Sequence, residues 1–214
     1  MTFTPPSFDS EFLKKLDELF VWRRDVRHFT SVPLAPEIFD AILDRACLAP
    51  SVGNSQPWRL VRVDSQHRRD LVIENFERCN TRALAGYSGE QARLYSSLKL
   101  AGLQDAPVHL AVFTDVVTSQ GHGLGKNTMP EVMHYSTSCM IMSLWLAARA
   151  RGVGVGWVSI VDPNVITGSL DVPRGWEFNA YLCLGYPDDQ EKTPELERLG
   201  WQSREHTARR VLSR

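Results

Sequence analysis

The sequence predicts a single α+β domain. Apolar residues at helical spacing and short apolar runs typical of strands follow one another without the regular alternation of a βαβ protein. Hydrophobic and charged residues make up 43% and 23% of the 214 residues, which are the proportions of a globular protein that buries a core. No internal repeat and no linker interrupts the sequence, so residues 1–214 are predicted to form one domain.

Charge and hydropathy narrow the range of partners. The formal net charge is -1, which argues against nucleic acid as a partner. The first six residues, MTFTPP, lack the basic and apolar regions of a signal peptide. The apolar segment Leu144–Ala150 is interrupted by Arg149 and follows several polar residues, which is typical of a buried helix rather than a membrane span. We therefore expect a cytoplasmic protein with no membrane partner.

Cysteine and histidine spacing gives no sign of a metal site. The four cysteines, at positions 47, 79, 139 and 183, form no Cys-x-x-Cys pair, and reduced thiols are expected. Cys139 and Cys183 lie in apolar runs and are predicted to be small core residues. The six histidines show no i, i+4 pair, so no metal is expected.

The first half of the chain predicts three helices and a strand. Apolar residues at helical spacing predict an amphipathic helix over Phe8–Val21. A second helix begins at Pro36, which suits a first helical turn, and ends before Pro50. A strand follows at Trp58–Val63, and a further helix at His67–Leu84.

The segment Ala85–Gln104 is helix-like but rich in glycine and serine. Its low apolar content fits a movable lid, and an exposed surface hairpin is the alternative. The predicted fold therefore includes a small lid segment around residues 85–104.

The second half of the chain contains the longest predicted helix, Glu131–Arg151, which is apolar on most sides. Such a helix lies at the centre of a fold or in an oligomer interface. It follows a predicted strand, Val108–Val117, and a glycine-rich loop, Gly121–Lys126, whose spacing does not match a Walker phosphate loop. The remaining predicted elements are a strand at Val153–Val161, a helix at Asn164–Leu170 and a strand at Glu177–Leu184.

The strand Val153–Val161 contains glycines at positions 154 and 156, where a ligand or another backbone can approach closely. Ser159 lies in the same predicted strand. Without further context, a hydroxyl group satisfied by its own sheet is as good an interpretation of Ser159 as a functional one.

A dense group of arginines follows the first predicted helix. Arg23, Arg24 and Arg27 fall within five positions, with Asp25 and Val26 between them. Arginine binds phosphates and carboxylates through paired hydrogen bonds, so the group indicates a site for an anion. The alternative is a solvated helix end whose cations complement the helix dipole.

A polar loop lies between Pro50 and Pro57. It contains Ser51, Asn54 and Gln56, whose side chains both donate and accept hydrogen bonds. These side chains suit a flat heteroaromatic ligand with alternating C=O and N–H edges. A plain turn is the alternative, because the same residue types are common in turns.

Together these blocks resemble the flavin-dependent nitroreductase family over about residues 19–185. The resemblance rests on Arg-Arg-Asp-Val-Arg-His-Phe, on Pro-Ser-Val-Gly-Asn-Ser-Gln-Pro-Trp after the next helix, and on the late glycine-containing strand. It implies a nitroreductase-like fold, with a central mixed, mainly antiparallel sheet flanked by helices. Ordinary nitroreductases usually carry a small hydroxyl residue at the position of Asp25. Asp25 together with Ser159 resembles the 5,6-dimethylbenzimidazole synthase branch of the family.

The resemblance implies FMN as the flavin and a homodimer that holds it at the interface, with the helix Glu131–Arg151 at the contact. The arginines would hold the phosphate and the ribityl side, the polar loop would meet the isoalloxazine edge, and Arg204 would add a phosphate contact. The FMN-binding residues implied in this way are Arg23, Arg24, Asp25, Val26, Arg27, Ser51, Asn54, Gln56, Ser159 and Arg204.

The activity implied for this branch is the oxygen-dependent fragmentation of reduced FMN to 5,6-dimethylbenzimidazole and erythrose 4-phosphate, which supplies the lower ligand of cobalamin. Asp25 and Ser159 would be the catalytic residues, and the nearby arginines are expected to keep Asp25 ionised. No Gly-x-Gly-x-x-Gly motif follows a strand, so an external flavin reductase or another reductant would supply reduced FMN. The alternatives are an NAD(P)H-dependent FMN nitroreductase or flavin reductase, and a non-catalytic flavin-binding protein.

Overall fold

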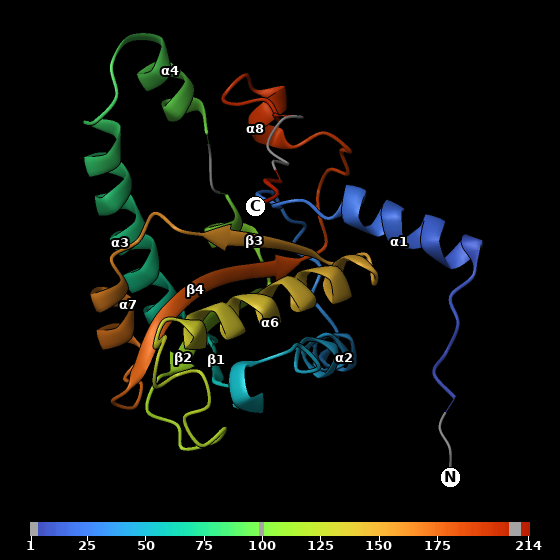
Figure 1. Cartoon of the computed structure of the whole chain (residues 1–214). Helices are drawn as coiled ribbons and strands as arrows, with labels where there is room; N and C mark the ends of the chain where they lie inside the picture. The colour runs from blue at the N-terminus through green and yellow to red at the C-terminus, as the bar shows by residue number, and fades with distance from the viewer. Residues whose placement is uncertain (1–3, 99–100, 206–210) are drawn as a thin grey trace.

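A four-stranded sheet forms the centre of the computed structural model, which describes residues 4–98, 101–205 and 211–214 (Figure 1). The strand order is β1-β2-β4-β3, and all neighbouring strands are antiparallel. Outside these strands, a single-residue bridge between Asp25 and Val155 is parallel. The predicted central sheet is therefore confirmed, and its four strands pair in antiparallel fashion throughout. The strands are β1 (Trp58–Arg62), β2 (Val108–Asp115), β3 (Gly154–Val158) and β4 (Trp176–Gly185).

Helices cover both faces of the sheet (Figure 1). One face packs against α2 (Pro36–Ala46) and α6 (Val132–Arg149), and the other packs against α3 (Gln66–Leu84) and α7 (Pro163–Ser169). Every residue of the central strand β2 is buried. Because side chains alternate along a strand, this strand supplies both hydrophobic cores at once, which explains its continuous apolar sequence.

The remaining elements lie outside these layers. The first helix, α1 (Ser10–Trp22), has no buried residue and projects from the body of the molecule (Figure 1). Its N-terminus is capped by Asp9, whose carboxylate accepts the N–H of Phe12 at 2.8 Å. The others are η1 (Val52–Asn54), α4 (Gly89–Ser97), α5 (Gly102–Asp105) and α8 (Glu195–Arg198).

Most predicted elements are present within a few residues of their expected bounds, with two corrections that concern candidate residues. The strand Val153–Val161 is shorter than predicted, because β3 ends at Val158 and leaves Ser159 exposed one residue beyond it. Cys183 is buried as expected, but Cys139 is exposed on the outer side of α6, so its assignment to the core is wrong.

The predicted lid segment folds as α4 and α5, while its residues 99–100 lie outside the described part of the chain. Its role as a lid stays a prediction. Among the helices within the described ranges, none combines the length and the apolar character needed to cross a membrane.

Candidate functional site

The arginine group is held in place by an unusually close contact with β3. After α1 ends, the chain becomes extended and the N–H of Val26 donates to the carbonyl of Val155 at 3.0 Å. A Cβ atom at Gly156 would lie 2.2 Å from the carbonyl oxygen of Val26. Glycine is therefore required at position 156. The predicted close approach at this strand is confirmed, and the approaching group is the backbone of Val26.

This contact places Asp25 against the end of β3. Its Oδ1 accepts the N–H of Trp157 at 2.8 Å, and its Oδ2 lies 3.6 Å from Nε of Arg27. Trp157 is two residues before Ser159, so Asp25 and Ser159 belong to the same end of the strand. The catalytic role of this pair of residues stays a prediction.

The electrostatic environment of Asp25 differs from the expected one. Burial raises the pKa of Asp25, and the charge of Glu195 adds to this, while the Trp157 N–H and Arg27 act in the opposite direction. The expectation that the arginines outweigh burial and lower the pKa of this group is therefore wrong. Although 36% of the Asp25 side chain is exposed, the surrounding protein disfavours the charged form.

The guanidinium groups form a cationic cluster that fits an anion. The guanidinium of Arg23 lies 5.0 Å from the ring centroid of Trp145, and its buried Nε has no hydrogen-bond partner within residues 4–98, 101–205 and 211–214. Burial lowers the pKa values of Arg23 and Arg24, and the charge of Arg204 lowers both further. Mutual repulsion of this kind is relieved when a phosphate binds.

A crevice connects this cluster to the C-terminal segment. It is lined by residues 24–27, by Trp145 and by side chains between Pro187 and Arg198. Arg24 holds this C-terminal segment in place, because its Nε donates to the carbonyl of Lys192 at 2.7 Å. In Figure 1 its helix α8 lies between α1 and α4. The candidate site therefore lies between residues 24–27, near the N-terminus, and residues 187–198, near the C-terminus.

The polar loop after α2 lies elsewhere in the molecule. The N–H of Val52 donates to Oγ of Ser136 in the first turns of α6 at 3.0 Å, and Oγ of Ser51 accepts the N–H of Gln56 at 3.0 Å. Asn54 and Gln56 are exposed and have left-handed backbones, with φ of 53° and 45°. Such strained conformations concentrate at functional sites.

Within one chain, α6 separates the two halves of the predicted flavin site. The arginine group is fixed near the end of α6 by a 3.0 Å hydrogen bond from Nε1 of Trp145 to the carbonyl of Arg24. Trp145 and Ser136 are 145 − 136 = 9 residues apart on the helix, which is about 14 Å along its axis. The structure thus gathers residues 23–27 with Arg204 and with β3, which ends one residue before Ser159, but does not bring the loop to them.

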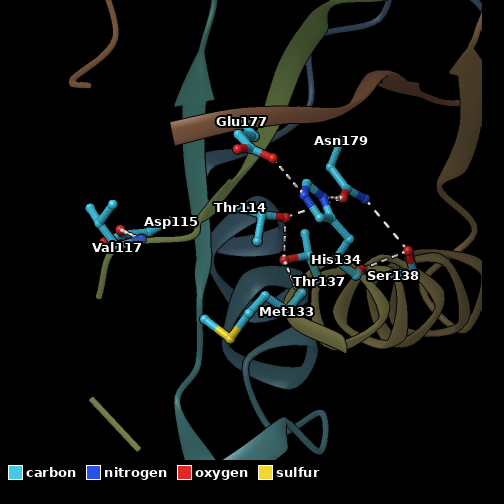
Figure 2. A network of polar contacts seen from close by, with 9 residues as sticks. All are labelled: Thr114, Asp115, Val117, Met133, His134, Thr137, Ser138, Glu177 and Asn179. Atoms are coloured by element: carbon cyan, nitrogen blue, oxygen red, sulfur yellow. Dashed lines mark hydrogen bonds and ion pairs between the residues drawn. The ribbon is translucent and has the colours of Figure 1, made fainter. Parts of the chain in front are cut away.

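A partly buried polar network that the sequence did not predict anchors the start of α6 (Figure 2). His134 contacts Asn179 through Nδ1 and Glu177 through Nε2, both at 2.9 Å. Oγ1 of Thr114 lies 2.8 Å from that of Thr137. Asn179 reaches α6 because it is the extra residue of a β-bulge, where Val112 and Phe113 pair with Ala180 and Phe178. Strand periodicity contains no signal for such a bulge.

The glycine-rich loop also contributes to the site. A Cβ at Gly53 would lie 2.9 Å from the carbonyl oxygen of Gly121, and Nε2 of Gln120 donates to the carbonyl of Asn54 at 3.1 Å. The loop around Gly121 therefore supports the polar loop. The glycines at positions 121, 123 and 125 have left-handed backbones. Their spacing in the sequence does not indicate that this loop contacts the polar loop.

With this geometry established, comparison with known proteins defines the class. The chain belongs to the nitroreductase family, which it matches over residues 20–186. It is also 57% identical to a 5,6-dimethylbenzimidazole synthase from Rhodospirillum rubrum, with 94% of this chain and 95% of that protein covered. A 5,6-dimethylbenzimidazole synthase from Rhodobacter capsulatus is 44% identical, with 92% and 95% covered. The resemblance drawn from Asp25 and Ser159 is therefore confirmed.

A solved structure supports the fold. Oxidized iodotyrosine deiodinase bound to FMN and 3-iodo-L-tyrosine matches with a TM-score of 0.70 and 21% identity, covering 93% of this chain and 97% of that chain. Identity this low shows a shared fold alone. The predicted nitroreductase-like α+β fold is confirmed.

Proposed function

We propose that this protein is an oxidoreductase of the 5,6-dimethylbenzimidazole synthase type, which fragments reduced FMN with oxygen to 5,6-dimethylbenzimidazole and erythrose 4-phosphate. The observation that carries the proposal is the position of Asp25. A carboxyl group with a raised pKa lies in a crevice beside three arginines, in a chain 57% identical to a named synthase. The product would serve as the lower ligand of cobalamin.

The crevice and the cationic cluster beside it fit FMN. The Nε of Arg23, which has no hydrogen-bond partner among the described residues, and the crowded charges of Arg23, Arg24 and Arg204 suit a phosphate group. Arg27 and Val26 continue along the crevice and would face the ribityl side. FMN, when bound, supplies the ring and the ribityl chain whose cleavage yields the product.

Asp25 is suited to hold or accept a proton from the ribityl chain. Forming the benzimidazole carbon from C1′ of the chain requires loss of hydrogen there and at a neighbouring hydroxyl. A carboxylate with a raised pKa is a stronger base than an ordinary one, and a catalytic base works best with a pKa near the working pH. Ser159 would donate or accept one hydrogen bond beside it.

A homodimer would complete the site. Tyr135, Cys139 and Met142 are exposed along one side of α6, and α1 carries exposed Phe12, Leu13 and Phe20. In a two-fold symmetric pair whose α6 helices run antiparallel, the start of one α6 lies beside the end of the other. The Ser51–Gln56 loop of one protomer would then meet the arginine group of its partner.

The rest of the proposal concerns access and electron supply. The segment 85–104 would cover the bound flavin as a lid and keep water from the reaction. An external flavin reductase or another reductant would deliver reduced FMN. We propose a cytoplasmic setting, where reduced flavin is available.

One assay tests the proposal. Purified protein is mixed in air with chemically reduced FMN, and 5,6-dimethylbenzimidazole and erythrose 4-phosphate are measured by mass spectrometry. We expect both products in equal amounts. Complete recovery of FMN without benzimidazole would rule out the proposed reaction, and rapid NAD(P)H oxidation with a nitroarene would identify a nitroreductase instead.

The Asp25→Asn variant makes this assay specific to the site. It should still bind FMN, because its shape and the acceptor for the Trp157 N–H persist, while product formation falls by at least about a hundredfold. Asp17→Asn on the exposed side of α1 is the matched control. Normal product formation by Asp25→Asn would show that Asp25 has no catalytic role.

A further inference from the structure

Three aromatic rings connect α4 to the C-terminal segment. The rings of Tyr87 and Tyr95 stack with centroids 4.8 Å apart. The ring of Trp201 meets Tyr87 edge-on at 5.5 Å and lies 6.2 Å from Tyr95. Offset and edge-on pairs at these distances are attractive. The cluster joins parts of the chain that are more than a hundred residues apart.

Both sides of this aromatic cluster are anchored. Tyr95 is buried and its hydroxyl donates to Oδ1 of Asn80 on α3 at 2.7 Å. Trp201 follows the left-handed Gly200, and the backbone N–H of Trp201 donates to the carbonyl of Leu196 in α8 at 2.8 Å. The turn at Gly200 therefore directs the indole ring away from α8 and into the two tyrosines.

Arg204 lies three residues beyond Trp201. Its charge acts on both Arg23 and Arg24, so it belongs to the cationic cluster of the candidate site. No secondary structure holds residues 202–205 in the described chain. Among the described residues that lead from α8 to Arg204, Trp201 is the one whose side chain is packed into an aromatic cluster.

From this arrangement we infer that Tyr87, Tyr95 and Trp201 are positioning residues that hold Arg204 for the phosphate of the flavin. The inference rests on the proposed function. It assigns to α4 and its preceding turn a part in selecting FMN over riboflavin, which has the same ring and ribityl chain but no phosphate. It also links phosphate binding to the position of the segment predicted to act as a lid.

The test measures dissociation constants of oxidised FMN and riboflavin by quenching of flavin fluorescence. Trp201→Ala should weaken FMN binding by about five- to tenfold and change riboflavin binding less than about twofold. Tyr87→Ala, on the other side of the cluster, should give the same selective loss. Trp201→Phe, which keeps a ring, should restore most of the FMN affinity. Leu199→Ala, an exposed residue of the same segment, is the matched control and should change neither constant.

A double-mutant cycle with Arg204→Gln separates positioning from general damage. Because the rings act through Arg204, Trp201→Ala should have little further effect on FMN binding once Arg204 is replaced. Equal losses for FMN and riboflavin, or fully additive losses in the double variant, would overturn the inference and leave the proposed function intact. Wild-type protein that binds FMN but forms no benzimidazole would overturn the proposed function alone.

Discussion

Asp25 is the residue at which the geometry and the proposed chemistry meet. One carboxylate oxygen is held by the N–H of Trp157, while the other faces Arg27 at 3.6 Å. Three nearby arginines predicted that the ionised form of this carboxyl would be favoured, yet burial outweighs them and raises its pKa. The sequence could show which charges lie close in the chain, but not how much water the fold removes from them.

This raised pKa predicts a pH dependence of stability. The folded protein retains the proton of Asp25 at pH values where the unfolded chain, with a usual aspartate pKa of about 4, has lost it. Stability contributed by the group is therefore lost as the pH rises above that value. The melting temperature of flavin-free Asp25→Asn should therefore rise relative to wild type as the pH increases above about 4.

Thermal unfolding followed by circular dichroism at several pH values measures this difference. Asp17→Asn again controls for the loss of one negative charge. A melting-temperature difference between Asp25→Asn and wild type that is the same at every pH would contradict the assigned direction of the pKa shift.

At the scale of elements, α6 determines where each half of the site lies. Its end holds Arg24 through Trp145, and its start holds Val52 through Ser136. The network around His134 and Asn179 fixes that start against β2 and β4 (Figure 2). The polar network is therefore expected to matter for folding and for the position of the Ser51–Gln56 loop.

Replacing Thr137 tests this element. Thr137→Val keeps the shape but removes one of the two hydrogen-bond partners of the buried Thr114 hydroxyl, the other being Asn179, which should cost about 1 kcal/mol of unfolding free energy. Thr167→Val on α7 is the matched control, because its exposed hydroxyl bonds only the carbonyl of Pro163 in its own helix. Urea unfolding at fixed protein concentration measures both. Equal losses of unfolding free energy in the two variants would show that the network stabilises the fold no more than an ordinary helix hydroxyl does.

The same elements show how far the sequence could be interpreted. Helical and strand periodicity located α2, α3, α6 and the strands, because these patterns follow from burial of one side of each element. The two motifs identified the family because each keeps its residues close together in the chain. The bulge at Asn179 and the early end of β3 before Ser159 depend on pairing between strands, which no local pattern encodes.

At the scale of the whole molecule, the proposed site needs two chains. The arginine group and the Ser51–Gln56 loop lie near opposite ends of α6. The separation of these two motifs along one helix was not visible in the sequence, because it depends on where two loops dock on α6. In the sequence, only the presence of both motifs in one chain could be recognised.

Subunit mixing tests this composite site. Arg23→Ala and Asn54→Ala should each abolish most FMN binding as homodimers, because every site then lacks one of its two contributing sides. Unfolding and refolding an equal mixture should restore about a quarter of the wild-type sites, since half the dimers are mixed and each has one intact site. FMN titration counts the sites. The absence of any recovery, with mixed dimers confirmed by native mass spectrometry, would show that each site is built from a single chain.

The contact between Val26 and Val155 has a consequence beyond flavin binding. Because β3 is the last strand in the order β1-β2-β4-β3, its outer edge would present free backbone groups to other molecules. The backbone that delivers Asp25 occupies part of this edge. Substitutions that displace residues 25–26 therefore unmask a surface that favours strand-to-strand aggregation. Changing the proposed catalytic position and keeping the protein free of aggregation are linked requirements, so Asp25 is easier to replace in place than to move along the chain.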